Sequence, residues 1–567
     1  MKNIYLTLLL LFGLTGLFQS QVIAQESPRN PLTLSGGLNV NTIFSSGLNN
    51  ANKPFNYFLS GNFNLQFFDQ LNIPININFS DRKINLSQGY SFNQFSISPT
   101  IQWATFHLGT NYMNFSPYTL NGHQFLGVGV ELNPGNWDIQ LMSGRLLKGQ
   151  FSDTTNTTGP TFNRYANGAK VSYNPGKFNV GFSVLDSKDR SSSIPESNRI
   201  FNGQVLNPED NLIVSLTFGA ILLDRLQFNA EFSNSLVTKD NNQLYEPLKI
   251  DGLSGLFKKG NVSSESNNAF NLNLAYNLNS NGGIIGLAFE QIDPNYKTHG
   301  AYYFLEDLRK YTLNYSQNFW DNKLNLNSNI GVQQDDIYKN KASSGSRFIG
   351  SLNMNAQPDE SLHLGLNFSN FQSFMFVNDI YSQITRIPGQ PIDSLDFSMI
   401  SQNLGLSVNK TLNQSETRSN GITFQMNYLI SNNRRDGVAL EAQKSNILNG
   451  TLSYNMNFIE KGTALNIGMN MLNNTIAENK LKGFGPAIMV QKELLDKKIT
   501  GGLNFSWLRT NLSSPEISKQ NSSVSNIQLI SNYRPKEKHN FSLNAGLVKS
   551  ENPQAFLNGT LGYSYSF

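Results

Sequence analysis

The stretch Ala555–Phe567, AFLNGTLGYSYSF, decides how the rest of the chain is interpreted. Side chains of a strand point alternately to its two faces, so residues two apart share a face. One face would carry Leu557, Gly559, Leu561, Tyr563, Tyr565 and Phe567. The other would carry Asn558, Thr560, Gly562, Ser564 and Ser566. The stretch therefore predicts a strand with one apolar and one polar face that ends on an aromatic residue.

The same alternation recurs from Leu32 onward, and Phe55–Phe67 and Leu71–Ser80 show it most cleanly. Short motifs rich in Asn, Asp, Gly and Pro separate pairs of such segments, and these residues favour tight turns. They are Asp69–Gln70, Asn133–Gly135, Asn174–Gly176, Asp224–Arg225, Asn279–Gly282, Asp321–Lys323, Pro358–Asp359, Gln414–Asn420, Glu460–Gly462, Asp496–Lys497 and Pro535–Lys536. Longer polar stretches lie between the pairs, at 148–163, 186–210, 234–268, 333–346 and 371–397. The alternating segments amount to about 26 strands, to within two.

A terminal strand of this pattern resembles the C-terminal signature of Gram-negative outer-membrane β-barrels, in the style of the Bacteroidota, without indicating one member. The resemblance implies an all-β fold: one large antiparallel up-and-down barrel with short periplasmic turns and long extracellular loops. It also implies that Tyr563, Tyr565 and Phe567 form an assembly signal for the barrel-insertion machinery. A soluble sandwich array or propeller would alternate too, but the mature chain shows no fixed-period repeat. A closed sheet also satisfies every backbone polar group within lipid.

The N-terminus is interpreted as a secretory signal peptide, residues 1–24, followed by a barrel over 25–567. Lys2 supplies the positive start, Tyr5–Phe18 the apolar core, and Ala24 a small residue before the cleavage point. An uncleaved anchor is the alternative, although the apolar run is short for a spanning helix. We expect export to the outer membrane. The first strand would begin too soon after cleavage to leave room for an N-terminal plug domain.

Composition narrows the function classes. The chain has 43 Lys and Arg against 39 Asp and Glu, a balance that does not favour nucleic-acid binding. There is no Cys, which excludes disulfides and thiolate metal sites. The five His residues show no metal-ligand spacing, and Ser280–Gly282 is better explained as a turn than as part of a hydrolase. We predict no catalytic residue, cofactor or metal, and no enzymatic activity.

The face opposite the lipid is predicted to be an uncharged polar wall, because amides and hydroxyls bind water and sugars without selecting for charge. The lumen-lining candidates are Asn62, Asn64, Asn76, Asn78, Asn325, Asn327, Asn329, Asn367, Gln425, Asn427, Asn466 and Asn544. Glu131, Glu231 and Glu290 are scattered inward carboxylates that form no charge ring. This wall is consistent with a neutral conduit. It is also consistent with a wall whose side chains hydrogen-bond to one another and that never conducts.

Two functions follow from this pattern. The first is a passive channel for small hydrophilic, largely uncharged solutes. The alternative is a closed or partner-plugged barrel, an accessory or scaffold of a secretion, adhesion or outer-membrane assembly complex. The loop 371–397 is unusually apolar and is the candidate contact for an outer-membrane or surface protein, since exposed apolar surface often marks a contact site.

Overall fold

The structure is a computed structural model that describes most of the chain after residue 31. The described residues are 32–46, 55–68, 70–81, 93–151, 159–201, 204–241, 246–278, 282–302, 304–339, 346–373, 398–435, 438–439, 444–515, 519–550 and 555–567. The expected signal peptide and nearly all of loop 371–397 lie outside these residues. No helix among the described residues is long and apolar enough to cross a membrane.

The first half of the chain contributes strands of four to fifteen residues, apart from three two-residue pieces. They are β1 (Leu32–Ser46), β2 (Phe55–Phe67), β3 (Leu71–Ser80), β4 (Gln94–Ile97), β5 (Thr100–Ile101), β6 (Ala104–Asn114), β7 (Asn121–Leu132), β8 (Trp137–Leu147), β9 (Asn163–Tyr173), β10 (Phe178–Arg190), β11 (Ile200–Phe201), β12 (Gln204–Val205), β13 (Asp210–Leu222), β14 (Leu226–Thr238), β15 (Ser264–Asn277) and β16 (Ile284–Ile292). Single 3₁₀ turns occur at η2 (Ser191–Ser193), η3 (Glu196–Asn198) and η4 (Ser254–Leu256).

The second half continues the same sheet. Its strands are β17 (Leu308–Phe319), β18 (Leu324–Asp335), β19 (Ser346–Asp359), β20 (Leu362–Ser373), β21 (Ser398–Gln414), β22 (Arg418–Arg435), β23 (Val438–Ala439), β24 (Ser445–Phe458), β25 (Thr463–Ile476), β26 (Asn479–Leu494), β27 (Ile499–Ser513), β28 (Gln520–Lys536), β29 (His539–Ser550) and β30 (Phe556–Ser566).

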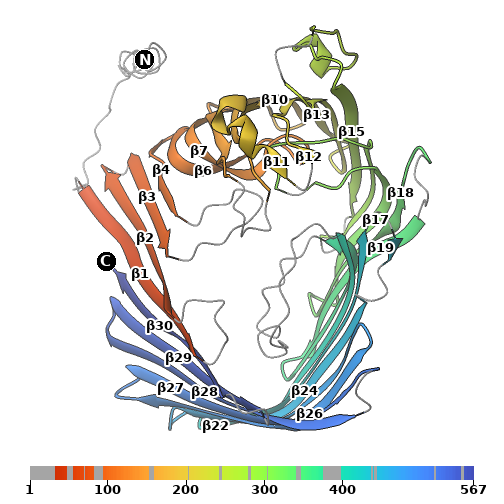
Figure 1. The fold of residues 1–567 in the computed structure, drawn as a ribbon. Helices are drawn as coiled ribbons and strands as arrows, with labels where there is room; N and C mark the ends of the chain where they lie inside the picture. The colour runs from red at the N-terminus through yellow and green to blue at the C-terminus, as the bar shows by residue number, and fades with distance from the viewer. Residues whose placement is uncertain are drawn as a thin grey trace.

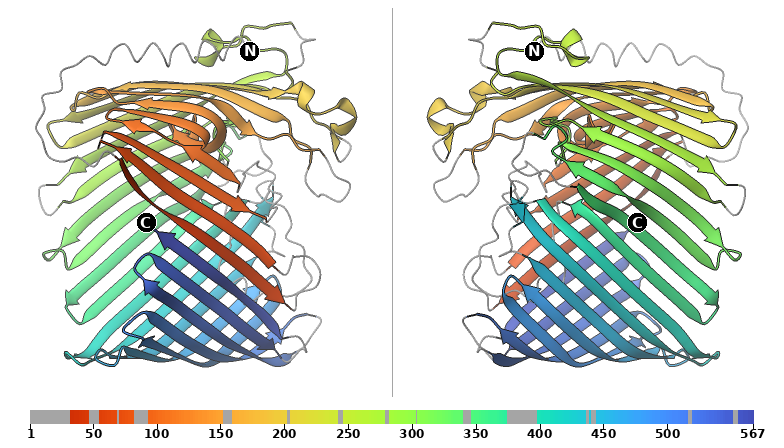
Figure 2. Two further views of the ribbon diagram at one scale, coloured as in Figure 1. Left: turned by 90° about the vertical axis from the view of Figure 1, so that its left-hand side faces the viewer. Right: turned by 90° about the vertical axis from the view of Figure 1, so that its right-hand side faces the viewer.

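These strands form one closed antiparallel barrel of 26 strands (Figures 1 and 2). β4 and β5 pair with the same two neighbours and are parts of one interrupted strand, while β23 extends the β22 hairpin and β11 and β12 form a separate small sheet. The first and last strands pair with each other, which closes the sheet. The predicted fold class and strand number are therefore confirmed.

Closure depends on the C-terminal strand that the alternating pattern predicted. β30 pairs with both β29 and β1, and the backbone of Phe567 exchanges hydrogen bonds with Gly36 at 3.1 and 3.2 Å. Gly36 has φ +153°, and a Cβ there would lie 2.2 Å from the carbonyl oxygen of Asn62. The ring of Phe567 also lies 5.9 Å from that of Phe63. Only glycine fits this close approach at the seam.

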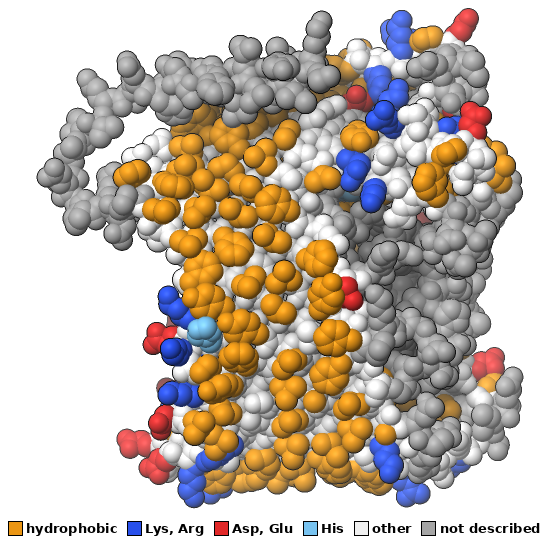
Figure 3. All heavy atoms as spheres, turned by 60° about the vertical axis from the view of Figure 1, so that its left-hand side comes forward, with side chains coloured by type: hydrophobic (Ala, Val, Ile, Leu, Met, Phe, Trp, Pro, Cys, Tyr) orange, Lys and Arg blue, Asp and Glu red, His pale blue; other side chains and the backbone are white. Residues whose placement is uncertain are grey.

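The outer face carries a broad apolar band. Leu126, Val128, Phe218 and Leu313 are among many large hydrophobic side chains that are more than a third exposed. Figure 3 shows hydrophobic side chains covering one side of the barrel between two rims, with Lys, Arg, Asp and Glu concentrated at the rims. Such a band is favourable against hydrocarbon and costly against water.

Three strands run farther than the alternation predicted. β10 continues to Arg190, β14 reaches Thr238 and β15 begins at Ser264, so the loops predicted at 186–210 and 234–268 are shorter in the structure. The alternation fails there because both faces of these strand ends are covered by other parts of the chain. Asn234, for example, points outward from β14 and is nevertheless 1% exposed.

Candidate functional site

The predicted wall residues lie on the strand faces opposite the exposed apolar side chains. Register places Asn327, Asn353 and Asn367 directly across from one another on β18, β19 and β20. The row continues through Gly405 of β21 to Asn427 and then Asn449. We call Asn327, Asn353, Asn367, Asn427 and Asn449 the amide ladder. Cross-strand partners are about 5 Å apart, so the ladder is a row of neighbouring amide groups that is interrupted only at Gly405.

The other wall candidates fall on the same inward face. Asn62 pairs with Asn76, and Asn64 with Pro74, while Asn78 pairs with Ser60. The remaining pairs are Asn325 with Asn355, Asn329 with Ser351, Gln425 with Thr451, Asn466 with Asn455, and Asn544 with Thr560. Every one of these partners is uncharged, so these parts of the inner wall can bind a solute through hydrogen bonds without attracting or repelling charge.

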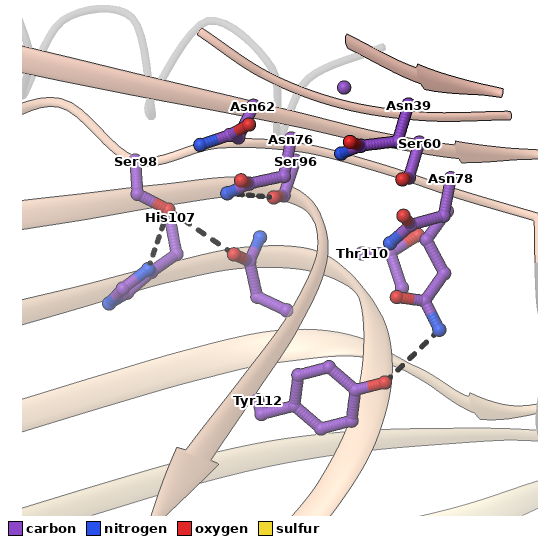
Figure 4. A pocket seen from close by; sticks show the side chains of 13 residues that line it. Asn39, Ser60, Asn62, Asn76, Asn78, Ser96, Ser98, His107, Thr110 and Tyr112 are labelled. Atoms are coloured by element: carbon purple, nitrogen blue, oxygen red, sulfur yellow. Dashed lines mark hydrogen bonds between the residues drawn. The ribbon is translucent and has the colours of Figure 1, made fainter. Parts of the chain in front are cut away.

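Two open recesses lie along this wall. The first, about 520 Å³, is lined by polar side chains from β1 to β6, which point toward a common space in Figure 4. Asn76 donates to Ser96 at 3.4 Å, and Ser98 contacts His107 Nδ1 at 3.1 Å. The second, about 480 Å³, lies beside the amide ladder and includes Asn327 and Asn367. Both could accommodate a small hydroxylated solute.

The inner face of β6–β17 differs from this wall, because it carries a packed core. One cluster joins Met113, Phe115, Leu120, Phe125, Met142, Leu146, Ala166, Leu185 and Ile213. A second joins Tyr118, Ala269, Ile292, Tyr296 and Leu308. The sequence analysis predicted only a polar lumen face and missed this core. In Figure 1 these strands lie along the top and upper right of the barrel.

Two inward loops complete the core: the β6–β7 loop, residues 115–120, and the β16–β17 loop, residues 293–307. Tyr296 donates its hydroxyl to the carbonyl of Tyr118 at 3.0 Å, and Thr298 donates to the carbonyl of Thr119 at 2.6 Å. The backbone N–H of Asn121 donates to the carbonyl of Gly300 at 2.8 Å. The β16–β17 loop therefore crosses the inner face to strands far from its own hairpin.

His299 fixes the far end of that loop. Its Nε2 lies 3.2 Å from Glu209, and its Nδ1 lies 2.8 Å from the hydroxyl of Ser187. Lys297 donates to the same carboxylate at 2.6 Å, and Arg164 donates to it at 3.2 Å. A neutral imidazole fits this arrangement by donating from Nε2 to Glu209 and accepting from Ser187 at Nδ1.

Burial and charge agree with that assignment. Burial, reinforced by the positive charge of Arg164, lowers the pKa of His299 to about 3. Burial alone would raise the pKa of Glu209, but the hydrogen bond from His299 and the charge of Lys297 lower it below its ordinary value. His299 is therefore neutral and Glu209 ionised near neutral pH. The Ser187–His299–Glu209 chain has the residue types of a hydrolytic triad, but Ser187 and His299 are buried and closed to a substrate.

The three inward carboxylates each have a partner. Glu131 lies 3.3 Å from His107, Glu231 accepts from Ser215 at 2.7 Å, and Glu290 accepts from Lys310 at 2.7 Å. Within the described ranges, no group of three or more His, Cys, Asp and Glu could hold a metal ion. Each of these carboxylates is therefore paired with a neighbouring side chain and stabilises the wall around its own strand.

The network around His299 was not found by sequence reasoning. Arg164, Glu209 and His299 are separated by loops and strands, and no spacing motif connects them. The one available signal was the occurrence of His299 and Gly300 in a segment too polar for a lipid-facing strand.

Comparisons with known proteins give no match to a family model and no match to a curated protein. The fold is similar to the P pilus usher PapC translocation pore, with 10% identity over 94% of this chain and 99% of that chain, at a TM-score of 0.43. It is similar to OccAB4 of Acinetobacter baumannii, with 10% identity over 69% of this chain and 97% of that chain, at 0.30. It is also similar to the ferric enterobactin receptor PfeA of Pseudomonas aeruginosa, with 10% identity over 94% and 80%, at 0.36.

The barrel itself carries the assignment. A closed sheet leaves no backbone edge exposed to lipid, and an apolar band surrounds an inner wall of amides. Short turns gather at the end where β1 begins and β30 ends, and the longer connections gather at the other end. The chain is a closed 26-strand antiparallel β-barrel with the apolar outer surface of a membrane-spanning barrel.

Proposed function

We propose that the barrel is a passive channel for small hydrophilic, largely uncharged solutes. The observation that carries this proposal is the amide ladder together with the uncharged partners of the other wall residues. A solute that leaves water must exchange its hydrogen bonds, and a wall of amides and hydroxyls replaces them one by one. The packed core on the inner face of β6–β17 narrows the bore, so the conduit runs along β18–β30 and β1–β5 and the adjoining parts of β6, β16 and β17 that line the two recesses.

Export through a cleaved signal peptide, residues 1–24, and insertion guided by Tyr563, Tyr565 and Phe567 are parts of this proposal. So is the absence of catalysis, since the one Ser-His-Glu arrangement described above is closed to substrates. The 371–397 loop, expected to contact a protein partner, lies almost wholly outside the described residues.

The test is ion selectivity in a planar bilayer. The double variant Asn329→Asp and Asn367→Asp places two carboxylates on the wall, so the reversal potential in a KCl gradient should shift toward cation selectivity. Asn322→Asp, in the β17–β18 turn, adds one carboxylate outside the wall and should leave the potential almost unchanged. Swelling of proteoliposomes should be faster in small neutral sugars than in charged analogues.

Conductance that is indifferent to the wall variant would contradict the proposal. Absence of conductance in protein whose barrel is shown to be folded by its heat-dependent gel mobility would favour the alternative, a closed accessory barrel. In that case mild-detergent purification from native membranes should recover a stoichiometric partner.

A further inference from the structure

The loop between β14 and β15 forms a strap on the outer wall of the barrel. Its segment 252–262 covers the outward side chain of Asn234, which accepts from the backbone of Ser254 at 2.8 Å and donates to Asn268 at 2.8 Å. The hydroxyl of Ser254 donates to the backbone carbonyl of Asn234 at 2.5 Å. Polar groups that would otherwise meet lipid are thus satisfied within the protein.

The strap presents apolar side chains where it covers the wall. Leu256 and Phe257 are 74% and 61% exposed, and the ring of Phe257 lies 6.2 Å from that of Phe182 on β10. Phe182 belongs to the exposed apolar band, so the strap extends that band over the polar strand ends. The apolar side chains of the strap are therefore continuous with the band.

A row of cations follows directly above the band on β8–β10. Register pairs Arg145 with Tyr165, and Tyr165 with Lys188, so the two cations flank one exposed tyrosine on the outer face. Adjacent strands are about 4.8 Å apart, which places the two Cα atoms about 10 Å apart. Arg190 is exposed on the same face, two residues beyond Lys188. Among the described residues, neither Arg145 nor Lys188 forms a salt bridge.

Two carboxylates on this face share one cation of the strap. Asp186 and Asp210 both accept from Lys258 of the strap, at 2.6 Å in the case of Asp186. The positive charge of Lys188 also interacts with the carboxylate of Asp210. Because Lys258 compensates much of this negative charge, Arg145, Lys188 and Arg190 leave the patch with an excess of positive charge.

The height of these cations matches the outer headgroups. The ten residue steps from Phe178, at the turn end of β10, to Lys188 rise about 25 Å, at about 3.3 Å per residue and about 40° of tilt. The eight steps from Trp137 to Arg145 rise about 20 Å on the same basis. An apolar band is about 25 Å tall, so Lys188 lies at its outer edge and Arg145 about 5 Å below that edge, within reach of it for a long side chain.

We propose that Arg145 and Lys188, with Tyr165 between them and the strap beside them, bind a phosphorylated glycolipid of the outer leaflet. The cations bind its phosphates, as guanidinium and ammonium groups do, while its acyl chains lie on Phe182, Leu256 and Phe257. This site lies on the outer wall and is independent of the proposed conduit.

The test measures lipid retained by the whole folded barrel. Purified protein is incubated with lipid A, with dephosphorylated lipid A or with inorganic phosphate, and bound molecules are counted by native mass spectrometry. Arg145→Ala with Lys188→Ala should weaken lipid A binding about 25-fold, since each cation near an anionic surface contributes about five-fold. The swap Arg145→Lys with Lys188→Arg should keep most of the binding. Lys497→Ala with Lys498→Ala, in the β26–β27 turn, is the matched control and should bind normally.

Equal retention by the alanine pair and the turn control would overturn the proposal, as would equal binding of lipid A and its dephosphorylated form. Retention of inorganic phosphate alone would show an anion site without a lipid partner and would also overturn it. If the mass spectra show a co-purified protein bound to the barrel and no retained lipid, the partner of the strap is a protein and the lipid proposal is wrong. Heat-dependent gel mobility confirms that each variant is folded.

Discussion

Gly300 lies where the β16–β17 loop passes the β6–β7 loop. A Cβ at this position would lie 2.3 Å from the carbonyl oxygen of Thr119 and 2.7 Å from a methyl carbon of Leu185. The substitution Gly300→Ala should therefore displace the loop and cost about 1–3 kcal/mol, the usual range for overpacking. The free energy of urea unfolding in lipid measures this loss. Gly501→Ala on β27, where a Cβ meets nothing within 4 Å, should change it little. Equal effects of the two variants would contradict the packing argument.

His299 predicts a pH dependence of loop docking. Its pKa is about 3 in the folded protein against an ordinary 6.5, so the undocked loop binds a proton that the docked loop does not. Docking is therefore strongest above the ordinary value and weakens as the pH falls toward 3. The pKa of Glu209 is lowered as well, so its contribution is lost only at still more acid pH.

Hydrogen exchange of residues 293–302 measures this dependence. After correction for intrinsic rates, protection should be lower at about pH 5 than at about pH 7.5. His299→Gln cannot titrate, so it should reduce protection at both values and remove the difference between them. An unchanged difference in that variant would assign the pH dependence to another group.

At the scale of elements, the period-two alternation of polar and apolar residues was enough to predict most of the strands. The second and third predicted strands coincide with β2 and β3, and the turn at Asn133–Gly135 separates β7 from β8. The strap escaped prediction because Ser254 and Lys258 lie on it, while their partners Asn234 and Asp210 lie on strands. The alternation of polar and apolar residues reflects the environment of each strand face. Here one outward face contacts protein instead of lipid.

The strap should detach when Lys258 is neutralised. Lys258→Met leaves Asp186 and the largely buried Asp210 without their shared cation, and such a loss costs about 3–5 kcal/mol when fully buried and less in this partly exposed setting. Chymotrypsin should then cleave after Phe257 several-fold faster. Lys259→Met removes an exposed neighbour and should preserve the native cleavage rate.

The seam between β1 and β30 makes a separate prediction. Removal of Phe567 takes away both backbone hydrogen bonds to Gly36 and the ring contact with Phe63. Gly36→Val should have a similar effect through its clash with Asn62. Both changes should reduce the folded fraction several-fold, as read from heat-dependent gel mobility. Normal folding of both variants would show that the seam tolerates an open end.

At the scale of the whole molecule, the barrel divides into a packed side and an amide side. Replacing residues 294–306 by a short Gly-Ser linker removes the loop that crosses the packed side. Single-channel conductance should then rise by at least half, because conductance follows the open cross-section. Folding is checked by gel mobility, and an unchanged conductance in folded protein would show that the loop does not limit the bore.

The large-scale architecture was accessible from the sequence, whereas the division of its interior was not. Alternation showed that Asn327 and Asn367 face inward, and strand counting gave the barrel size. The packed core depends on contacts such as Tyr296 with Tyr118, which join residues far apart in the chain. No local pattern encodes such a contact, since each partner is unremarkable in its own segment.

The pairing of Gly36 with Phe567 has a consequence for biogenesis. The cylinder cannot close before β30 has been synthesised, because this strand alone joins β29 to β1, so the nearly finished chain must be kept from aggregating until then. A premature stop before β30 would leave β1 and β29 as two bare edges, a product that we expect quality-control proteases to remove rather than the membrane to accept.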